Sequence, residues 1–328
     1  MTLKSKIYSA TLSPIRFTCN LINTPAIILI YHRVTTLEND PQLLAINPDN
    51  FYKQIEWLKK NYNIISIEEL SDRLKDKKLP ERSIVITFDD GYADNYLEAL
   101  PILETLEAPA TFFVTTGIID TDKEFWWDDL ERVFLSRIDL PPSLSLNVSG
   151  NICRFDVSNQ KNKLNTYNEL HPILKFQNPS NRDLLVKSIL DWSGLNYKGR
   201  KTHRTMTQKE VIKLSKSEYA TIGAHTKSHS PLSILSKEEQ RKDIISSKEQ
   251  LENWTNNQIK YFSYPFGCKN DYNKNSIDIC KELNFDLVCS NYYGQVHSYS
   301  NIYELPRCLI RDWDLNLFKS QINKYFRY

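Results

Sequence analysis

Short apolar segments of strand length alternate with helical segments along most of this chain. The clearest strand-like segments are residues 26–31, 83–88 and 110–114, and apolar side chains recur at helical spacing in 50–61 and 95–106. This alternation constrains the fold strongly, because strands separated by helices pair in parallel through right-handed crossovers. The pattern therefore predicts an α/β fold built on a parallel sheet.

The alternation is interrupted between about residues 117 and 205. Segment 125–134 has helical spacing, 143–157 alternates around a Ser-Gly-Asn turn as a hairpin does, and two polar helices are expected near 158–174 and 180–193. Because long loops without structure are uncommon, we interpret this region as an inserted α+β segment.

The strand and helix rhythm returns at residue 207, where the sequence T-Q-K-E is typical of a capping box. Counting all strand-like segments gives about seven parallel strands. We therefore predict a distorted (β/α)-barrel over residues 26–328, carrying the insertion and preceded by a basic segment at 1–25. The later strands are expected at 219–223, 260–264, 285–289 and 307–310.

Composition excludes several classes of protein. The 328 residues are 25% charged and 41% hydrophobic, which is typical of a globular chain, and the net charge of +2 argues against a nucleic-acid partner. No apolar run is long enough to span a membrane, and segment 1–25 lacks the apolar core and cleavage site of a signal peptide. The six cysteines include no C-x-x-C pair, which favours reduced thiols in the cytoplasm.

Polar side chains gather where the predicted strands end. His32 follows the first strand, Asp89 and Asp90 follow the strand at 83–88, and His225 and His229 follow the strand at 219–223. The carboxyl ends of the strands of a barrel meet at one rim, so these side chains are expected to lie together. A purely structural role would not require three of the six histidines to fall at these points.

The adjacent carboxylates of Asp89 and Asp90 repel each other, so their burial requires a compensating metal ion or proton. His225 and His229, four residues apart, could bind one ion together with a carboxylate, which is the open three-ligand set typical of catalytic zinc. One aspartate would then bind the metal, and the other would accept a proton from metal-bound water. The alternative is an ordinary Asp-Asp-Gly turn and two unrelated loop histidines.

Four segments in order, ITFDDGY, LPILETLEAPATFFV, HTKSH and YPFG, resemble the polysaccharide deacetylases of the NodB-homology type (carbohydrate esterase family 4). The resemblance extends over about 27–310 without the insertion. It implies a NodB-like barrel and metal-dependent removal of N- or O-acetyl groups from sugars. It also implies that Asp89 is the catalytic base and that Asp90, His225 and His229 hold the metal.

The resemblance extends to the wall of the sugar site, with one departure. Tyr264, Pro265 and Phe266 correspond to the motif that lines the sugar, and a backbone N–H near Tyr264 is a candidate oxyanion donor. The arginine that usually precedes this motif and tethers the base is replaced by Ser263. Arg307, from the last strand, is expected to take over that role.

The general acid is a second departure. The usual late Leu-x-His motif is absent, and His297 does not match it. Residues 31–34, YHRV, resemble the exopolysaccharide deacetylases, a subset of the family in which the acid-bearing motif lies on the first strand. His32 is therefore expected to be the acid, with a buried core histidine as the alternative.

The sequence thus predicts a deacetylase that hydrolyses the N-acetyl group of an amino sugar in a polysaccharide or glycan precursor. It would use one divalent ion, zinc before cobalt or nickel. Trp126 is expected to stack on the sugar, unless it only begins an amphipathic helix with Asp128 and Asp129 in its first turn. A catalytically inactive carbohydrate-binding protein and a glycosidase are the alternative functions. The expected location is cytoplasmic, with segment 1–25 touching the inner membrane or packing on the domain as a surface helix.

Overall fold

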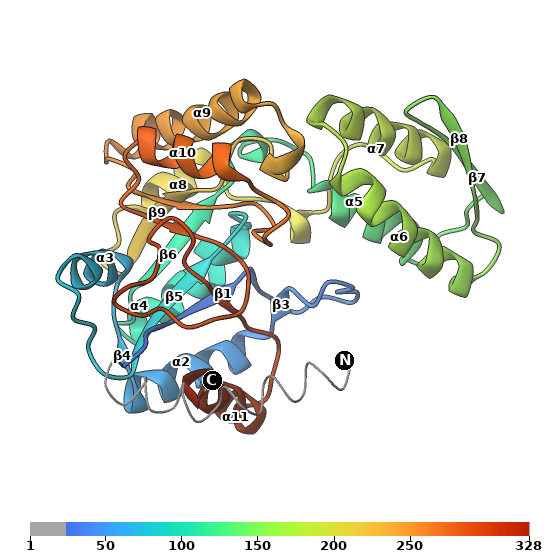
Figure 1. Ribbon diagram of the computed structural model, residues 1–328. Coiled ribbons are helices and arrows are strands. Elements are labelled where there is room, and N and C mark those ends of the chain that lie inside the picture. The colour runs from blue at the N-terminus through green and yellow to red at the C-terminus, as the bar shows by residue number, and fades with distance from the viewer. Residues whose placement is uncertain (1–23, 328) are drawn as a thin grey trace, which may run out of the picture.

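A parallel sheet forms the centre of the computed structural model, which describes residues 24–327 (Figure 1). Its strands are β1 (Ile27–Tyr31), β4 (Asn63–Ile64), β5 (Ser83–Phe88), β6 (Ala110–Val114), β9 (Ala220–Ala224), β10 (Tyr261–Ser263), β11 (Leu287–Cys289) and β12 (Cys308–Leu309). The order is β11-β10-β9-β6-β5-β1-β12, and β4 pairs beside β5. All these pairings are parallel, which confirms the predicted α/β barrel of about seven strands.

The strands are continuous apolar runs because helices and loops cover both faces of the sheet. Every residue of β1, β5 and β6 is buried. The first and last strands are neighbours, since Leu29 of β1 lies opposite Cys308 of β12. The ring is not fully closed: β11 and β12 are the edges, and Leu305, just before β12, bridges to Cys289 of β11.

Local capping signals set the ends of the outer helices. Asn47 caps the first of these helices, α2 (Pro48–Asn61), which was expected from residue 50. It begins at Pro48, because proline fits the first turn of a helix. The helix expected at 95–106 is split into a π-helical turn, η1 (Asn95–Ala99), and α4 (Leu100–Thr105), whose first turn contains Pro101. The other helices around the barrel are α3 (Ile67–Lys75), α8 (Gln208–Leu214), α9 (Lys237–Thr255), α10 (Lys274–Glu282) and α11 (Leu315–Arg327).

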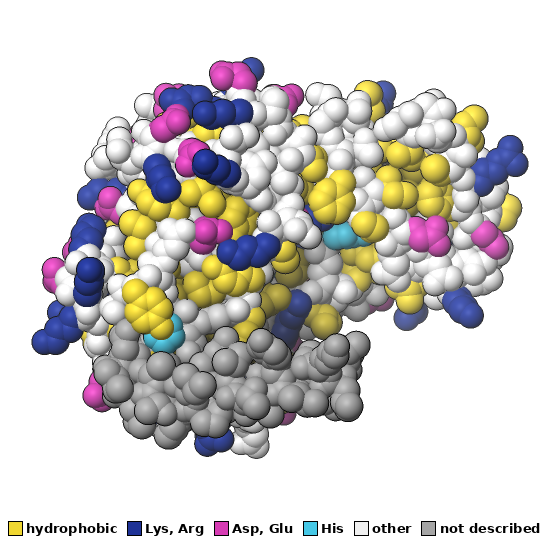
Figure 2. Space-filling view, viewed as in Figure 1, with side chains coloured by type: hydrophobic (Ala, Val, Ile, Leu, Met, Phe, Trp, Pro, Cys, Tyr) yellow, Lys and Arg dark blue, Asp and Glu magenta, His cyan; other side chains and the backbone are white. Residues whose placement is uncertain are grey.

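The inserted segment folds as a lobe beside the barrel, and both the ribbon and the space-filling view show it set apart from the main body (Figures 1 and 2). Its elements are α5 (Trp126–Phe134), β7 (Ser143–Val148), β8 (Asn151–Asp156), α6 (Gln160–Lys175) and α7 (Pro179–Ser193). The hairpin turns at Ser149 and Gly150, whose φ angles of 53° and 89° suit a type I′ turn. The lobe has its own hydrophobic core, centred on side chains such as Leu130, Leu170 and Ile189.

Several smaller expectations can be compared with the structure. The parallel pair β2 (Arg33–Val34) and β3 (Ala45–Ile46) was not predicted. Most of the basic segment 1–25 lies outside the described residues, as does Cys19, and the other five cysteines are free thiols. Within residues 24–327 no helix is long and apolar enough to cross a membrane.

A buried ion pair fixes the segment that follows β1. Nε of Arg33 donates to Asp94 at 3.0 Å, and the backbone N–H of Val34 donates to the other carboxylate oxygen of Asp94, also at 3.0 Å. The amide of Asn95 donates to the carbonyl of His32 at 2.7 Å. The position of His32 therefore depends on the turn that contains Asp94 and Asn95.

Replacement of Asp94 by Ala should destabilise the protein strongly, because it leaves the guanidinium of Arg33 buried without its partner. We expect the free energy of unfolding, measured in urea, to fall by ~3–5 kcal/mol. Asp72→Ala is the matched control, since its ion pair with Lys75 is exposed and should contribute less than about 1 kcal/mol. A double variant, Arg33→Met with Asp94→Leu, should recover much of the loss, and equal effects of the Asp94 and Asp72 substitutions would contradict the interpretation.

Candidate active site

The chain turns sharply directly after β5. Asp90 has a φ of 76° and Gly91 a φ of 87°, so both lie in the left-handed region that favours glycine. A side chain at Gly91 would also meet Val114 at 3.1 Å. Left-handed backbone at an aspartate costs energy, and such strain is concentrated at functional sites. In this turn the neighbouring carboxylates of Asp89 and Asp90 acquire different partners.

Asp90 lies among two histidines from the loop after β9. Its Oδ1 is 3.0 Å from Nε2 of His229 and 3.6 Å from Nε2 of His225. Nδ1 of His225 lies 2.8 Å from the carbonyl of Ser263, to which it donates when protonated there, so that Nε2 is left for an ion. All three side chains are buried, and their ligand atoms lie within 4.8 Å of one another.

The electrostatics of this cluster favour a bound cation. Burial raises the pKa of Asp90, but its contacts with the imidazoles of His225 and His229 outweigh it and lower that pKa far below its usual range. Burial lowers the pKa of His225, but the charges of Asp89 and Asp90 outweigh it and raise that pKa, so the two carboxylates attract a positive charge, a proton or a metal ion, to this position. Burial in turn lowers the pKa of His229, which favours the neutral imidazole that a metal requires. One carboxylate and two imidazoles with open positions are the donor set of a divalent metal site, so these residues fit the metal predicted from the sequence.

Asp89 is held by Arg307, which immediately precedes β12. Nη1 and Nη2 of Arg307 donate to Oδ1 and Oδ2 of Asp89 at 2.7 and 2.6 Å. Nη2 also donates to Oγ of Ser263, which in turn donates to Asp89 Oδ2. Burial raises the pKa of Asp89, but the charge of Arg307 outweighs it and lowers that pKa below its usual range. Arg307 thus binds Asp89, as predicted for the residue that takes over from the arginine replaced by Ser263.

His32 lies at the same rim, directly after β1. Burial lowers its pKa, and the charges of Asp90 and Asp89 act on the ring in the opposite direction. Its Nδ1 is buried and has no hydrogen-bond partner among residues 24–327. His297 lies elsewhere, because the adjacent Val296 pairs with Ala26 at the other end of β1, roughly 20 Å away at strand spacing.

The YPFG segment contributes one side chain to this site. The ring of Phe266 lies 4.9 Å from the ring of His229, and Phe266 has a φ of 58°. Tyr264, expected to line the sugar, is 1% exposed, stacks on Tyr272 at 4.1 Å, and uses its backbone N–H to bind the carbonyl of Cys289. Neither its ring nor its N–H is therefore available to a substrate. Its neighbour Pro265 is also buried.

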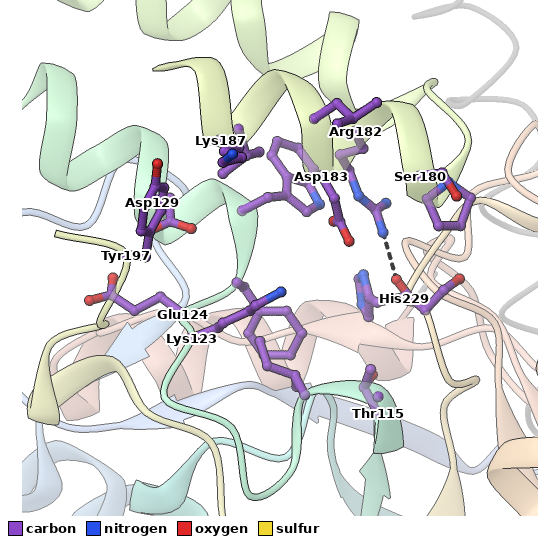
Figure 3. Close-up of a pocket in the computed structure, with 18 of the residues that line it drawn as sticks. Thr115, Lys123, Glu124, Asp129, Ser180, Arg182, Asp183, Lys187, Tyr197 and His229 are labelled. Carbon is purple, nitrogen blue, oxygen red and sulfur yellow. Dashed lines mark hydrogen bonds between the residues drawn. The ribbon is translucent and has the colours of Figure 1, made fainter. Parts of the chain in front are cut away.

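A cavity of about 690 Å³ lies between the lobe and the rim of the barrel, and His229 is in its wall (Figure 3). Trp126 lines it from α5, and the indole is tilted against the ring of His171 at 4.8 Å. Asp128 and Asp129 are buried, and burial raises their pKa values to about 8 and about 7. Trp126 does begin a helix with Asp128 and Asp129 in its first turn, as in the alternative interpretation, but the whole of α5 is buried. Its place in the cavity wall also leaves the predicted stacking on a sugar open.

Sequence reasoning missed one side chain at this site. Arg182, on α7 of the lobe, donates from Nη2 to the carbonyl of Ser228 at 2.7 Å, next to His229 (Figure 3). This contact joins the lobe to the loop that carries two of the three candidate ligands. A single arginine in a polar helix gives no local signal of such a contact.

Comparisons with known proteins agree with this geometry. Residues 76–140 and 196–288 match the family model described as polysaccharide deacetylase. The poly-beta-1,6-N-acetyl-D-glucosamine N-deacetylase of Escherichia coli (strain K12) is 27% identical over 129 residues, 34% of this chain and 19% of that protein. The protein of the same name from Staphylococcus aureus (strain MSSA476) is 36% identical over 74 residues, 22% of this chain and 26% of that protein. This chain thus spans only about a fifth to a quarter of the length of these curated relatives.

The fold is similar to that of a solved deacetylase. The structure of Streptococcus pyogenes deacetylase PplD in complex with acetate has a TM-score of 0.61 and 20% sequence identity, and the match covers 92% of this chain and 98% of that chain. At this identity the likeness supports the fold.

Removal of the two histidines should abolish metal binding. We expect the protein to retain about one divalent ion per chain after dialysis, and the double variant His225→Ala with His229→Ala to retain none, as measured by plasma mass spectrometry. His297→Ala is the control, because His297 lies at the opposite end of β1 and should leave the metal content unchanged. Full occupancy in the double variant would overturn the assignment.

Proposed function

We propose that this chain, which belongs to the polysaccharide deacetylase family, is a metal-dependent hydrolase that removes the N-acetyl group from an amino sugar of a polysaccharide or glycan precursor. The observation that carries the proposal is an ionised carboxylate beside a buried ligand set: Oδ2 of Asp89 lies 3.7 Å from Nε2 of His225. An acetamide substrate is supported by the names of the relatives, which are N-deacetylases.

The metal would be held by Asp90, His225 and His229. A divalent ion there would polarise the acetamide carbonyl and lower the pKa of water, so that water is a nucleophile at neutral pH. We propose zinc, which favours this donor set, with cobalt and nickel as the alternatives.

The other residues would move the protons. Asp89 stays ionised at neutral pH because Arg307 lowers its pKa, and in our proposal an Oδ atom accepts a proton from the attacking water. His32 would donate a proton to the leaving amine, and its unpartnered Nδ1 supports this assignment. Because burial lowers the pKa of His32, the ring must first take up a proton from solvent, which the charges of Asp90 and Asp89 favour. The rings of Phe266 and Trp127 lie 4.9 and 4.8 Å from the ring of His229 and would limit the access of bulk water.

The two alternative functions make different demands on the site. A glycosidase needs two carboxyl groups at least about 5 Å apart on opposite sides of the bond to be cleaved. Asp89 and Asp90 are instead neighbours at one strand end, and both approach the same nitrogen of His225, at 3.7 and 3.6 Å, as expected for groups that act at one metal site. A protein that only binds carbohydrate could hold the same ligands, so only turnover separates it from an enzyme.

Release of acetate tests the proposal directly. Zinc-loaded protein should release acetate from oligomers of N-acetyl-D-glucosamine, as followed by mass spectrometry, and should leave the glycosidic bonds intact. Removal of the metal with a chelator should stop the reaction, and addition of zinc should restore it. If metal-loaded protein binds such oligomers and releases no acetate, the binding-only alternative holds.

The cytoplasmic location remains a prediction, supported by free thiols such as Cys280, Cys289 and Cys308. The proposed contact of residues 1–25 with the inner membrane also remains untested. Cell fractionation addresses both, since recovery of the protein outside the cell would contradict them.

The two aspartates should have separable roles. Asp89→Asn should keep the metal and lower the turnover number by roughly 10² or more, because it removes the proton acceptor. Asp90→Asn should weaken metal binding first, because it removes a ligand. Metal content and acetate release measured on the same preparations check both, and the reverse pattern would exchange the roles.

The role of His32 can be tested with two leaving groups. If His32 protonates the amine, His32→Ala should lower turnover of an acetamide far more than turnover of an aryl acetate, whose phenolate leaves without a proton. Metal content should not change, and His297→Ala should have little effect on either substrate. Equal losses on both substrates would make His32 a structural or substrate-binding residue instead.

A further inference from the structure

Arg182 is a buried cation whose hydrogen-bonding capacity is only partly used. It is 4% exposed and lines the cavity between α7 and the loop that carries His229 (Figure 3). Nη2 donates to the carbonyl of Ser228, but Nε and Nη1 have no hydrogen-bond partner among residues 24–327. Burial lowers the pKa of Arg182, while the charges of Asp183 and Asp243 act in the opposite direction, and neither carboxylate forms an ion pair with Arg182 within 4.0 Å. A buried guanidinium with unpaired N–H groups destabilises the protein unless an anion accepts hydrogen bonds from it.

The mouth of the cavity adds further positive charge. Lys123, Lys187 and Lys227 line it with exposed side chains, and their ammonium groups have no ion-pair partner in the described part of the chain. Figure 3 shows Lys187 and Arg182 on α7, with Lys123 on the opposite side of the cavity. These cations therefore come from three separate segments that meet at one hollow.

Most of the acidic residues in the same wall are already neutralised by arginines outside it. Glu124 is paired with Arg200 at 2.8 Å, and Asp129 with Arg132 at 2.7 Å. Only Asp183, which is exposed, lines the cavity without such a partner in residues 24–327. Asp183 and Asp243 act on Arg182 only through longer-range charge, and the three lysines have no ion-pair partner in the described part of the chain, so positive charge at the cavity is only partly compensated.

A second buried donor points to the same ligand chemistry. Trp126 lines the cavity, and its buried Nε1 has no acceptor among the described residues. Buried N–H groups are nearly always paired in folded proteins. Trp126 and Arg182 together offer three nitrogen atoms whose N–H groups are unpaired, and no acceptor, which suits a group that carries only acceptor oxygens.

We propose that this cavity binds an anionic oxygen group, phosphoryl or carboxylate, that the substrate carries beside its acetylated sugar. Arg182 and Trp126 would donate hydrogen bonds to it, and the three lysines would attract it to the mouth. The identification of this anion as part of the substrate rests on the proposed function. Binding of the anion in the cavity does not depend on that function. The preferred substrate class is then an N-acetylated sugar that carries an acidic or phosphoryl group, and neutral oligomers of N-acetyl-D-glucosamine would be hydrolysed but bound more weakly.

The test compares three small sugars by isothermal titration calorimetry on the zinc-loaded protein. N-acetylglucosamine 1-phosphate and N-acetylmuramic acid carry a phosphoryl and a carboxylate group, and N-acetylglucosamine carries neither. We expect at least one anionic sugar to bind about tenfold or more tightly than the neutral one, the scale of hydrogen bonds to charged groups. Stronger binding of the phosphate or of the carboxylate identifies the group, and equal binding of all three sugars would overturn the proposal.

Variants attribute the preference to the cavity. Arg182→Gln should reduce affinity for the preferred anionic sugar about tenfold and leave that for the neutral sugar nearly unchanged. Lys161→Gln, which removes an exposed lysine of the same lobe outside this cavity, should have no effect. If Arg182→Gln does not fold, the double variant Lys187→Gln with Lys227→Gln should weaken the preference and make it less sensitive to salt. An unchanged preference in the folded variant would overturn the assignment.

One further variant separates this proposal from the proposed function. In His225→Ala, which should lack the metal, the preference for the anion should persist, because Arg182 and Trp126 are not metal ligands. Loss of the preference in that variant would assign the anion to the metal and overturn the cavity site. Anion binding without acetate release from any sugar by the zinc-loaded protein would contradict only the proposed function.

Discussion

Two adjacent carboxylates can share the end of β5 because each has its own compensating charge. Arg307 binds both oxygens of Asp89, whereas Asp90 faces His225 and His229. Without these partners, like charges at this distance in a buried site would force one carboxyl group to take up a proton. The partners come from the segment before β12 and from the loop after β9, so the site exists only when the sheet has curled far enough to bring both to β5.

Much of the fold could be predicted because its signals are local. Strands such as β1 and β5 are apolar on both faces, and the capping box at Thr207 and Glu210 marks the start of α8. The predicted limits of the short strands β10, β11 and β12 were one or two residues too wide, because strand ends depend on pairing with distant segments. The pair β2–β3 has two residues in each strand, too few to show any period.

The site was predictable to the extent that it follows strand ends. His32, Asp90 and His225 meet at one rim because parallel strands present their carboxyl ends together. A motif does not say which of its side chains faces the core, and so Tyr264 was assigned to the wrong environment. Arg182 contacts a loop 46 residues away in sequence, and no local pattern encodes such a distance.

The lobe enters and leaves the barrel between β6 and β9, which are neighbours in the sheet. The two segments that connect the lobe to the barrel lie close together, since the N–H of Gly199 donates to the carbonyl of Asp122 at 2.6 Å. A segment with adjoining ends can lengthen, shorten or be exchanged in evolution without displacing the residues of the barrel rim. In our proposal, hydrolytic chemistry and the choice of glycan are thus carried by separable lengths of chain, and relatives could diversify in what they recognise while inheriting one unchanged centre.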